Sequence, residues 1–86
     1  MSREEFITYI ESIGFKYYKK DSISVRYEYL CLTKYRIDIY RDIYYDIYDF
    51  WNGSEFVQNI HLNDLRLIQE CFKKELRSIK LRNILG

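Results

Sequence analysis

The stretch 38–49, DIYRDIYYDIYD, decides how the chain folds, because Asp-Ile-Tyr occurs in it three times at a spacing of four residues. A spacing of four fits one face of a helix. It also fits one face of a strand, since strand side chains alternate with a period of two. We favour strands, because Ile and Tyr prefer them and because aspartates at i and i+4 would repel each other on a helix. A helix over 38–51 is the alternative.

The residues that follow this repeat predict a hairpin. Asn-Gly at 52–53 lies between alternating apolar residues, which is the strongest short-range signal for a two-residue turn. Such a turn needs a strand on either side, and it would pair Trp51 with Ser54. Because 35–51 is too long for a single strand, we expect a break at 41–42.

The same register predicts the two faces of the sheet. Side chains alternate along a strand, so Ile39, Ile43 and Ile47 would share the core face with Trp51 and Phe56. The aspartates and tyrosines of the repeat would then lie on an open face, and we expect them to bind protein because tyrosine is enriched at interfaces. The alternative is a polar strand face that is merely solvated. The predicted binding residues are Asp38, Tyr40, Asp42, Tyr44, Asp46 and Tyr48.

The segments before the repeat predict one helix and two strands. Ser2 and Glu5 form a capping box at the start of the helix, and Gly14 suits the left-handed residue that ends it. The runs 15–20 and 23–32 then alternate as strands on either side of an Asp-Ser turn.

The last segment, 63–86, repeats apolar residues at helical spacing after Asn63, which we expect to be the N-cap. The predicted element order is α-β-β-β-β(-β)-α, with four or five strands. Antiparallel strands joined by short turns form a meander, and both amphipathic helices would pack on one face of it. Since 86 residues carry apolar material for a single core, we expect one α+β domain over 1–86.

Composition and charge indicate little about function directly. The chain has ten tyrosines and no proline, and its net charge is +1. Its charges nevertheless form blocks, basic over 16–36, acidic over 38–49 and basic over 73–82, which can steer a partner. The alternative is three solvated faces. Residue types with AT-rich codons dominate, which suggests a bacterial, phage or mobile-element genome.

Neither secretion nor a membrane span is predicted. The N-terminus is acidic and lacks a long apolar run, and no segment approaches the roughly 20 apolar residues that a span needs. We therefore expect a cytoplasmic protein. Cys31 and Cys71 lie far apart in the sequence, so we expect no metal site and, in a reducing compartment, two thiols. A disulfide between them is the alternative.

Catalytic, cofactor and metal motifs are missing from the sequence. His61 is the single histidine, and no serine or cysteine nucleophile stands in a triad pattern with it. The aspartates lack EF-hand spacing, and there is no glycine-rich phosphate loop. We therefore predict a protein that is not an enzyme and that uses no cofactor or metal.

The stretch 6–22, FITYIESIGFKYYKKDS, resembles the first helix, the Gly-Phe pair and the following strand of double-stranded-RNA-binding-like folds, including small HicA-type toxins. The resemblance covers these residues alone. The catalytic histidine of that family stands in a Gly-Ser-His turn, whereas the turn here is Asp21-Ser22-Ile23. No catalytic residue therefore carries over to this chain.

Two functions remain from the sequence. The first is a small phage- or mobile-element-encoded binding protein that inhibits a host factor, of the anti-CRISPR or anti-defence type, by protein contact through the predicted face. The alternative is a nucleic-acid-binding module that uses basic residues of the C-terminal helix. A homodimer, formed by the apolar tail or a strand edge, is a third arrangement. The basic residues of the alternative are Lys73, Lys74, Arg77, Lys80 and Arg82.

Overall fold

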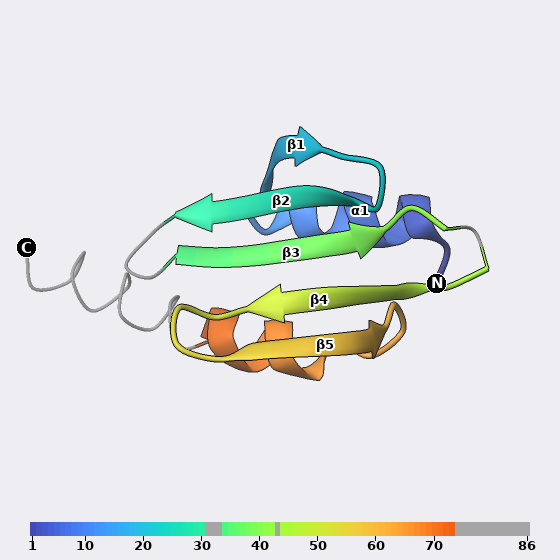
Figure 1. Cartoon of the computed structure of the whole chain (residues 1–86). Coiled ribbons are helices and arrows are strands. Elements are labelled where there is room, and N and C mark those ends of the chain that lie inside the picture. The colour runs from blue at the N-terminus through green and yellow to red at the C-terminus, as the bar shows by residue number, and fades with distance from the viewer. Residues whose placement is uncertain (31–33, 43, 74–86) are drawn as a thin grey trace, which may run out of the picture.

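A computed structural model gives the fold, and it describes residues 1–30, 34–42 and 44–73. In this part of the chain one helix is followed by five strands and by a second helix over 66–73 (Figure 1). The predicted α+β class and element order are confirmed, with five strands among the described residues. The elements are α1 (Arg3–Ser12), β1 (Lys16–Lys20), β2 (Ser24–Leu30), β3 (Lys34–Tyr40), β4 (Ile47–Trp51) and β5 (Phe56–His61).

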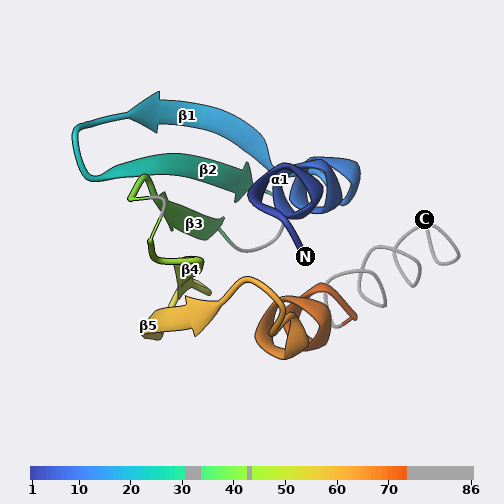
Figure 2. The ribbon, with the colours of Figure 1, turned by 90° about the vertical axis from the view of Figure 1, so that its right-hand side faces the viewer.

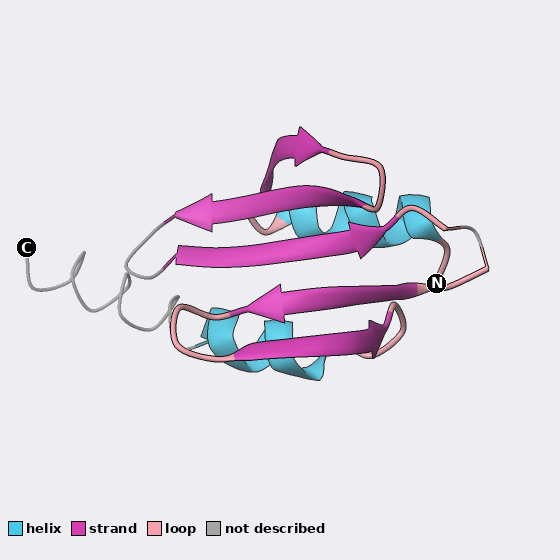
Figure 3. Ribbon diagram, viewed as in Figure 1, coloured by secondary structure: helices cyan, strands magenta, loops and turns pink. Residues whose placement is uncertain are grey.

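The strands form one antiparallel sheet in the order β1-β2-β3-β4-β5, which is the predicted meander. Seen along its edge, the sheet is a single layer and both helices lie on the same side of it (Figure 2). Helix α1 lies behind β2 and β3, and the helix over 66–73 lies behind β4 and β5 (Figure 3). The other face of the sheet has no covering layer among the described residues.

The core between sheet and helices is rich in aromatic rings. The ring of Phe6 lies 4.7 Å from that of Tyr48, and the rings of Tyr35 and Phe50 stack at 6.1 Å. Because each ring buries a large area, a chain this short still forms a substantial core. The buried apolar residues are Phe6, Ile10, Phe15, Tyr27, Tyr35, Ile37, Ile39, Tyr48, Phe50, Ile60, Leu62 and Ile68.

Helix α1 begins and ends as its sequence predicts. The Ser2 side chain accepts a hydrogen bond from the backbone of Glu5, and the Glu5 side chain accepts one from the backbone of Ser2. Gly14 has a φ of 118°, a conformation that side chains disfavour. A Cβ there would also lie 2.5 Å from the ring of Tyr29. Gly14 therefore turns the chain sharply from α1 into β1.

The Asp-Ile-Tyr repeat is divided between two strands, and the alternative of a helix over 38–51 is wrong. β3 ends at Tyr40, as predicted, and β4 begins at Ile47. On β3 the predicted faces are right, because Ile39 is buried in the core. On β4 they are inverted, because Tyr48 is fully buried whereas Ile47 is half-buried on the uncovered face.

The loop over 41–46 accounts for part of this inversion, because it interrupts the alternation of side chains that the prediction carried from β3 into β4. A buried tyrosine also needs a hydrogen-bond partner. Tyr48 has one, since its hydroxyl donates to the backbone carbonyl of Asp64 at 2.6 Å. Its ring then adds more apolar area to the core than an isoleucine would.

The β4–β5 turn is longer than predicted. Trp51 pairs with Phe56, so the loop has four residues, 52–55, and the predicted pairing of Trp51 with a closer residue is wrong. The Asn52 side chain stabilises the loop by accepting a hydrogen bond from the backbone of Glu55 at 2.8 Å. Trp51 lies opposite Arg36 and Phe56 lies opposite Trp51, so both lie on the uncovered face, and their predicted place in the core is wrong.

The second helix begins at residue 66, two residues later than an Asn63 N-cap predicts. The backbone carbonyl of Leu65 accepts a hydrogen bond from the Gln69 N–H at 2.9 Å, and the Asp64 side chain accepts one from the backbone N–H of Arg66 at 3.2 Å. The Asn63 side chain instead accepts one from the N-terminal amino group of Met1. None of the helices in the described part of the chain is long and apolar enough to cross a membrane. The predictions for Cys31, and so for its disulfide, for Ile43 and for residues beyond 73 lie outside the described residues.

Candidate binding surface

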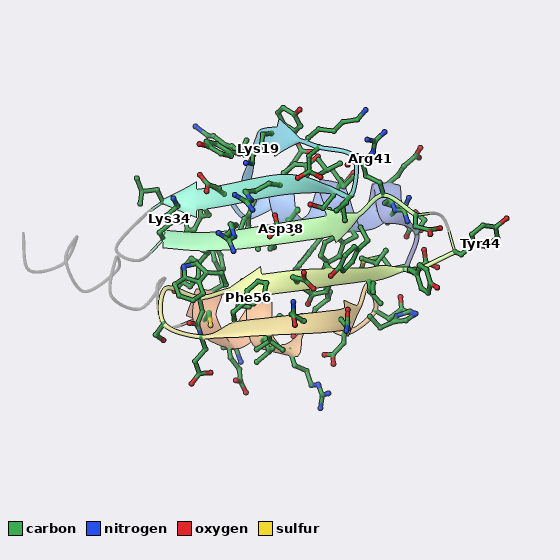
Figure 4. The ribbon with its side chains drawn as sticks, in the orientation of Figure 1. Lys19, Lys34, Asp38, Arg41, Tyr44 and Phe56 are labelled. Carbon is green, nitrogen blue, oxygen red and sulfur yellow. The ribbon has the colours of Figure 1, made fainter. Side chains whose placement is uncertain are left out.

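The uncovered face of the sheet is the candidate binding surface. Figure 4 views this face from the front, with Asp38 near its middle. Lys34 and Phe56 lie toward one end of the face, and Arg41 and Tyr44 lie toward the other. The middle and the two ends carry different chemistry, and each has its own structural basis.

Asp38 occupies the middle of the face and is held by two arginines. Arg26, directly opposite it on β2, donates from Nε to Oδ1 of Asp38 at 2.8 Å. Nε of Arg36 lies 3.4 Å from Oδ2, which is an ion-pair distance without hydrogen-bond geometry. The hydrogen bond to Asp38 raises the pKa of Arg26. Asp38 is 7% exposed and its carboxylate is occupied, so it is poorly placed to contact a partner.

Asp49 is the second buried carboxylate of the face, and it too is occupied. Its Oδ2 accepts a hydrogen bond from the Tyr40 hydroxyl at 3.0 Å, which raises the pKa of Tyr40. Its Oδ1 accepts from the backbone N–H of Asn59, also at 3.0 Å. Asn59 has a φ of 58° and lies where the β4–β5 register shifts, so Asp49 fastens a bulge in β5. These two aspartates are therefore structural.

The loop over 41–46 presents the exposed part of the repeat. Tyr44 is 86% exposed and projects from the end of the sheet (Figure 4). Asp42 and Asp46 are also exposed. Oδ1 of Asp42 accepts a hydrogen bond from the backbone N–H of Tyr44 at 3.0 Å, which shapes a local turn.

Arg3 of α1 holds the backbone of this loop by hydrogen bonds. Its guanidinium donates to the backbone carbonyls of Arg41, Asp42 and Tyr45, at distances of 3.3, 2.9 and 3.3 Å. Arg41 in turn donates to the backbone carbonyl of Asp21 in the β1–β2 turn at 2.7 Å. The described part of the loop is therefore tied both to α1 and to the neighbouring turn.

An open groove of about 830 Å³ lies between the β1–β2 turn and this loop. Its apolar lining includes Ile23, which is 66% exposed, together with Tyr45 and the half-buried Ile47. Asp21, beside it, accepts hydrogen bonds from the backbone N–H groups of Ser24 and Ile23, which lower its pKa. The remaining lining residues are Ser22, Tyr40, Arg41, Asp42 and Asn59.

The structure thus separates the six predicted binding residues into three groups. Asp38 and Tyr40 lie on the uncovered face, but their polar groups are engaged with other side chains. Tyr48 lies in the core, so its assignment to the binding face is wrong. The other three lie together in the exposed loop at the end of the sheet, and they are Asp42, Tyr44 and Asp46.

The prediction missed the apolar side of the groove. Ile23 was assigned to a strand, although it precedes β2 and lies in the turn. Ile47 was assigned to the core because the register of β4 was inverted, and Tyr45 was not among the predicted binding residues. The Asp-Ser turn and the expected break at 41–42 were the available signals, since both place these residues beside a chain reversal.

No group of three or more His, Cys, Asp or Glu side chains within 1–30, 34–42 and 44–73 is arranged to hold a metal ion. His61 is the last residue of β5, and its Nδ1 accepts a hydrogen bond from the backbone N–H of Asn63 at 3.1 Å. The histidine therefore shapes the turn into the second helix.

The basic residues of the nucleic-acid alternative lie almost entirely beyond the described residues. Lys73 is exposed on the second helix. Lys74, Arg77, Lys80 and Arg82 fall outside the described part, so nucleic-acid binding by this helix stays a prediction.

Comparisons of the chain with protein-family models, with curated proteins and with solved structures found no match. Function is therefore argued from the geometry and charge of the uncovered face.

Proposed function

We propose that this is a non-catalytic protein that binds a protein partner through the loop over 41–46 and the adjoining groove. The observation that carries the proposal is the exposure of Tyr44 beside two exposed carboxylates on a backbone held by Arg3. A tyrosine has only two side-chain torsions, so it contributes contact area at a small entropic cost. The apolar groove beside it can accept a side chain of the partner.

The partner surface that fits is basic. Asp42 and Asp46 are exposed, and Arg41 is the single basic residue of the loop. Opposite charges across an interface accelerate association and select the partner. We infer that the partner presents lysine or arginine side chains around an apolar residue that enters the groove between Ile23 and Tyr45.

We propose that this binding inhibits the partner. A domain of this size, docked on a basic surface, blocks whatever that surface normally binds. Composition suggests a phage or mobile-element protein acting on a host factor, of the anti-defence type, and nucleic acid is the usual ligand of a basic surface. Inhibition would then require no catalytic residue in this chain.

A pair of matched double variants tests the proposal. Y44A/D46K removes the exposed ring of the loop and reverses one of its charges. Y18A/E55K makes the same two chemical changes at exposed residues outside the loop, on β1 and in the β4–β5 turn. The wild type and both variants are used as bait for affinity capture from the native host, and mass spectrometry identifies the captured proteins. Circular dichroism confirms that each variant is folded. We expect a partner that the wild type and Y18A/E55K retain and that folded Y44A/D46K loses. Equal retention by both variants contradicts the proposed surface.

A second copy of the chain is the alternative partner. Light scattering of the wild type measures this directly, since a stable homodimer would double the measured mass. A dimer that Y44A/D46K dissociates would make the loop a self-association surface, which is contrary to the proposal. A monomer at working concentration leaves the loop open to a different protein.

A further inference from the structure

A row of basic and aromatic side chains crosses the uncovered face at the end opposite to the loop. Cross-strand pairing places Lys16 opposite Glu28, Glu28 opposite Arg36, Arg36 opposite Trp51 and Trp51 opposite Phe56. Directly paired residues point to the same face of a sheet, so one row spans all five strands. Figure 4 shows Lys34 and Phe56 at this end.

The positive charges in this region exceed the negative ones. Five basic residues lie on this face of β1, β2 and β3, whereas the strands carry three carboxylates on it, Glu28, Asp38 and Asp49. The exposed Glu55 lies in the adjoining β4–β5 turn. Each of the three is already paired, since Glu28 lies 3.3 Å from Nζ of Lys34 and the other two are held as described above. The five basic residues are Lys16, Lys19, Arg26, Lys34 and Arg36.

Arg36 is the residue best placed to bind an anion. Its guanidinium carbon lies 5.7 Å from the centre of the Phe56 ring, so cation and ring face each other. Its Nε lies 3.4 Å from Oδ2 of Asp38, whereas Nε of Arg26 makes the 2.8 Å hydrogen bond to Oδ1 of that carboxylate. Among the described residues its buried Nε has no hydrogen-bond partner, and a guanidinium binds phosphate oxygens through a fork of N–H donors.

Aromatic faces stand directly beside these charges. Phe56 is 43% exposed, and Trp51, paired with it across β4 and β5, is partly exposed. Bases of a single strand stack on such rings, whereas the paired bases of a duplex are stacked on each other and are not accessible. A basic sheet face with an adjoining aromatic pair therefore matches the chemistry of a single-stranded nucleic acid.

We propose that this half of the face is a binding site for single-stranded nucleic acid. The backbone phosphates lie along Lys16, Lys19 and Arg36, and a base stacks on Phe56 or Trp51. The site is separate from the loop over 41–46, and it does not depend on the protein contact proposed above. It also differs from the predicted site on the C-terminal helix, because both helices lie on the opposite side of the sheet (Figure 2).

Trp51 is the single tryptophan of the chain, so its fluorescence reports directly on the site. The full chain is titrated with oligothymidylate and oligouridylate at low salt, and fluorescein-labelled copies give the affinity by anisotropy. We expect the Trp51 emission to be quenched in step with the anisotropy change, and the affinity to fall steeply with salt. An anisotropy change without quenching would place the strand elsewhere and overturn the proposal, as would no binding at low salt.

Matched variants then locate the strand. Lys19→Glu alters the uncovered face, whereas Lys20→Glu makes the same charge change at the next residue. Lys20 pairs with Val25, which packs against the core, so it points to the helix side. Lys73→Glu makes it on the second helix. We expect Lys19→Glu alone to lower the salt slope, by about one. Equal effects of all three, or a dominant effect of Lys73→Glu, would contradict the site.

Phe56→Leu separates stacking from charge, because it keeps an apolar side chain and all the lysines. We expect it to weaken binding about tenfold, the lower range for the loss of one stacked base. Polyglutamate serves as the competitor that represents an acidic protein segment. If polyglutamate binds as tightly as the oligonucleotides and Phe56→Leu weakens neither, the surface is an anion site for acidic protein and the proposal is wrong. Circular dichroism confirms that each variant is folded.

Discussion

The hydroxyl of Tyr48 donates a hydrogen bond of 2.6 Å to the backbone carbonyl of Asp64, and this bond joins β4 to the start of the second helix. Tyr48 is fully buried against Phe6 of α1, so one side chain connects both helices to the sheet. Burial raises the pKa of the Tyr48 phenol well above its usual value of 10.0, and the Asp64 carboxylate raises it further.

Stability should therefore fall in alkaline solution. A folded-state pKa raised above the unfolded value means that the contribution of Tyr48 is fully present below pH 10 and is lost as the pH rises above it. Tyr48→Phe removes the ionisable group along with its hydrogen bond, so we expect a loss of about 1–2 kcal/mol at neutral pH. Above pH 10 the wild type should lose up to about 1.4 kcal/mol per pH unit more than the variant. Urea unfolding between pH 7 and 11 measures this, and parallel curves for the two proteins would contradict it.

Asp49 is expected to matter for stability and not for binding. Asp49→Ala leaves the Asn59 N–H and the Tyr40 hydroxyl without an acceptor, so we expect a loss of about 2–3 kcal/mol. Asp49→Asn keeps one oxygen for the Asn59 N–H, and it should cost about 1 kcal/mol. Urea unfolding ranks the two variants, and a neutral Asp49→Ala would show that the bulge does not need this carboxylate.

Arg3 should control the order of the loop over 41–46. Arg3→Met keeps most of the apolar length of the side chain and removes three hydrogen bonds to backbone carbonyls. We expect faster hydrogen exchange at the Tyr45 amide, which donates to the carbonyl of Asp42 at 3.1 Å, with little change in the exchange of the core strands. Partner binding should weaken in the same variant, because the loop must then be ordered on binding. Unchanged exchange at Tyr45 would show that the loop does not depend on Arg3.

The general architecture was predictable because its signals are local. The capping box of Ser2 and Glu5, the left-handed Gly14 and the alternation along β2 and β3 each involve only a few neighbouring residues. Amphipathic helices at both ends of a meander must cover its apolar face, so their common side also followed from the sequence.

The register of β4 was not predictable in the same way. Asn-Gly predicts a two-residue turn, whereas the Asn52 side chain bonds favour a four-residue loop, which moves the pairing of β5 by two positions and leaves its faces unchanged. The inversion of β4 arises instead at the loop over 41–46, which interrupts the alternation that β3 begins. Alternating Ile and Tyr offers no preference between the two registers by hydropathy alone. The tertiary bond from Tyr48 to Asp64 selects one of them.

The candidate site was predicted only in part, because some of its features are local in the sequence and others depend on contacts between strands. The acidic and tyrosine-rich loop was visible in the sequence, and Asp42, Tyr44 and Asp46 are exposed in it. The roles of Asp38 and Asp49 depend on arginine and tyrosine side chains from neighbouring strands. That both carboxylates are already paired with other groups could be recognised only once the pairing of the strands was known.

Tyrosine nitration with tetranitromethane, mapped by mass spectrometry, tests the central claim most directly, because two exposed tyrosines and one buried tyrosine serve as native probes. In the protein alone we predict rapid nitration of Tyr44 and Tyr18, which are 86% and 58% exposed, and protection of the buried Tyr48. In complex with the captured partner, Tyr44 should become protected while Tyr18 remains reactive. Nitration of Tyr48 as fast as Tyr44 would contradict the fold of the repeat, and a Tyr44 that reacts equally fast in the complex would contradict the binding surface.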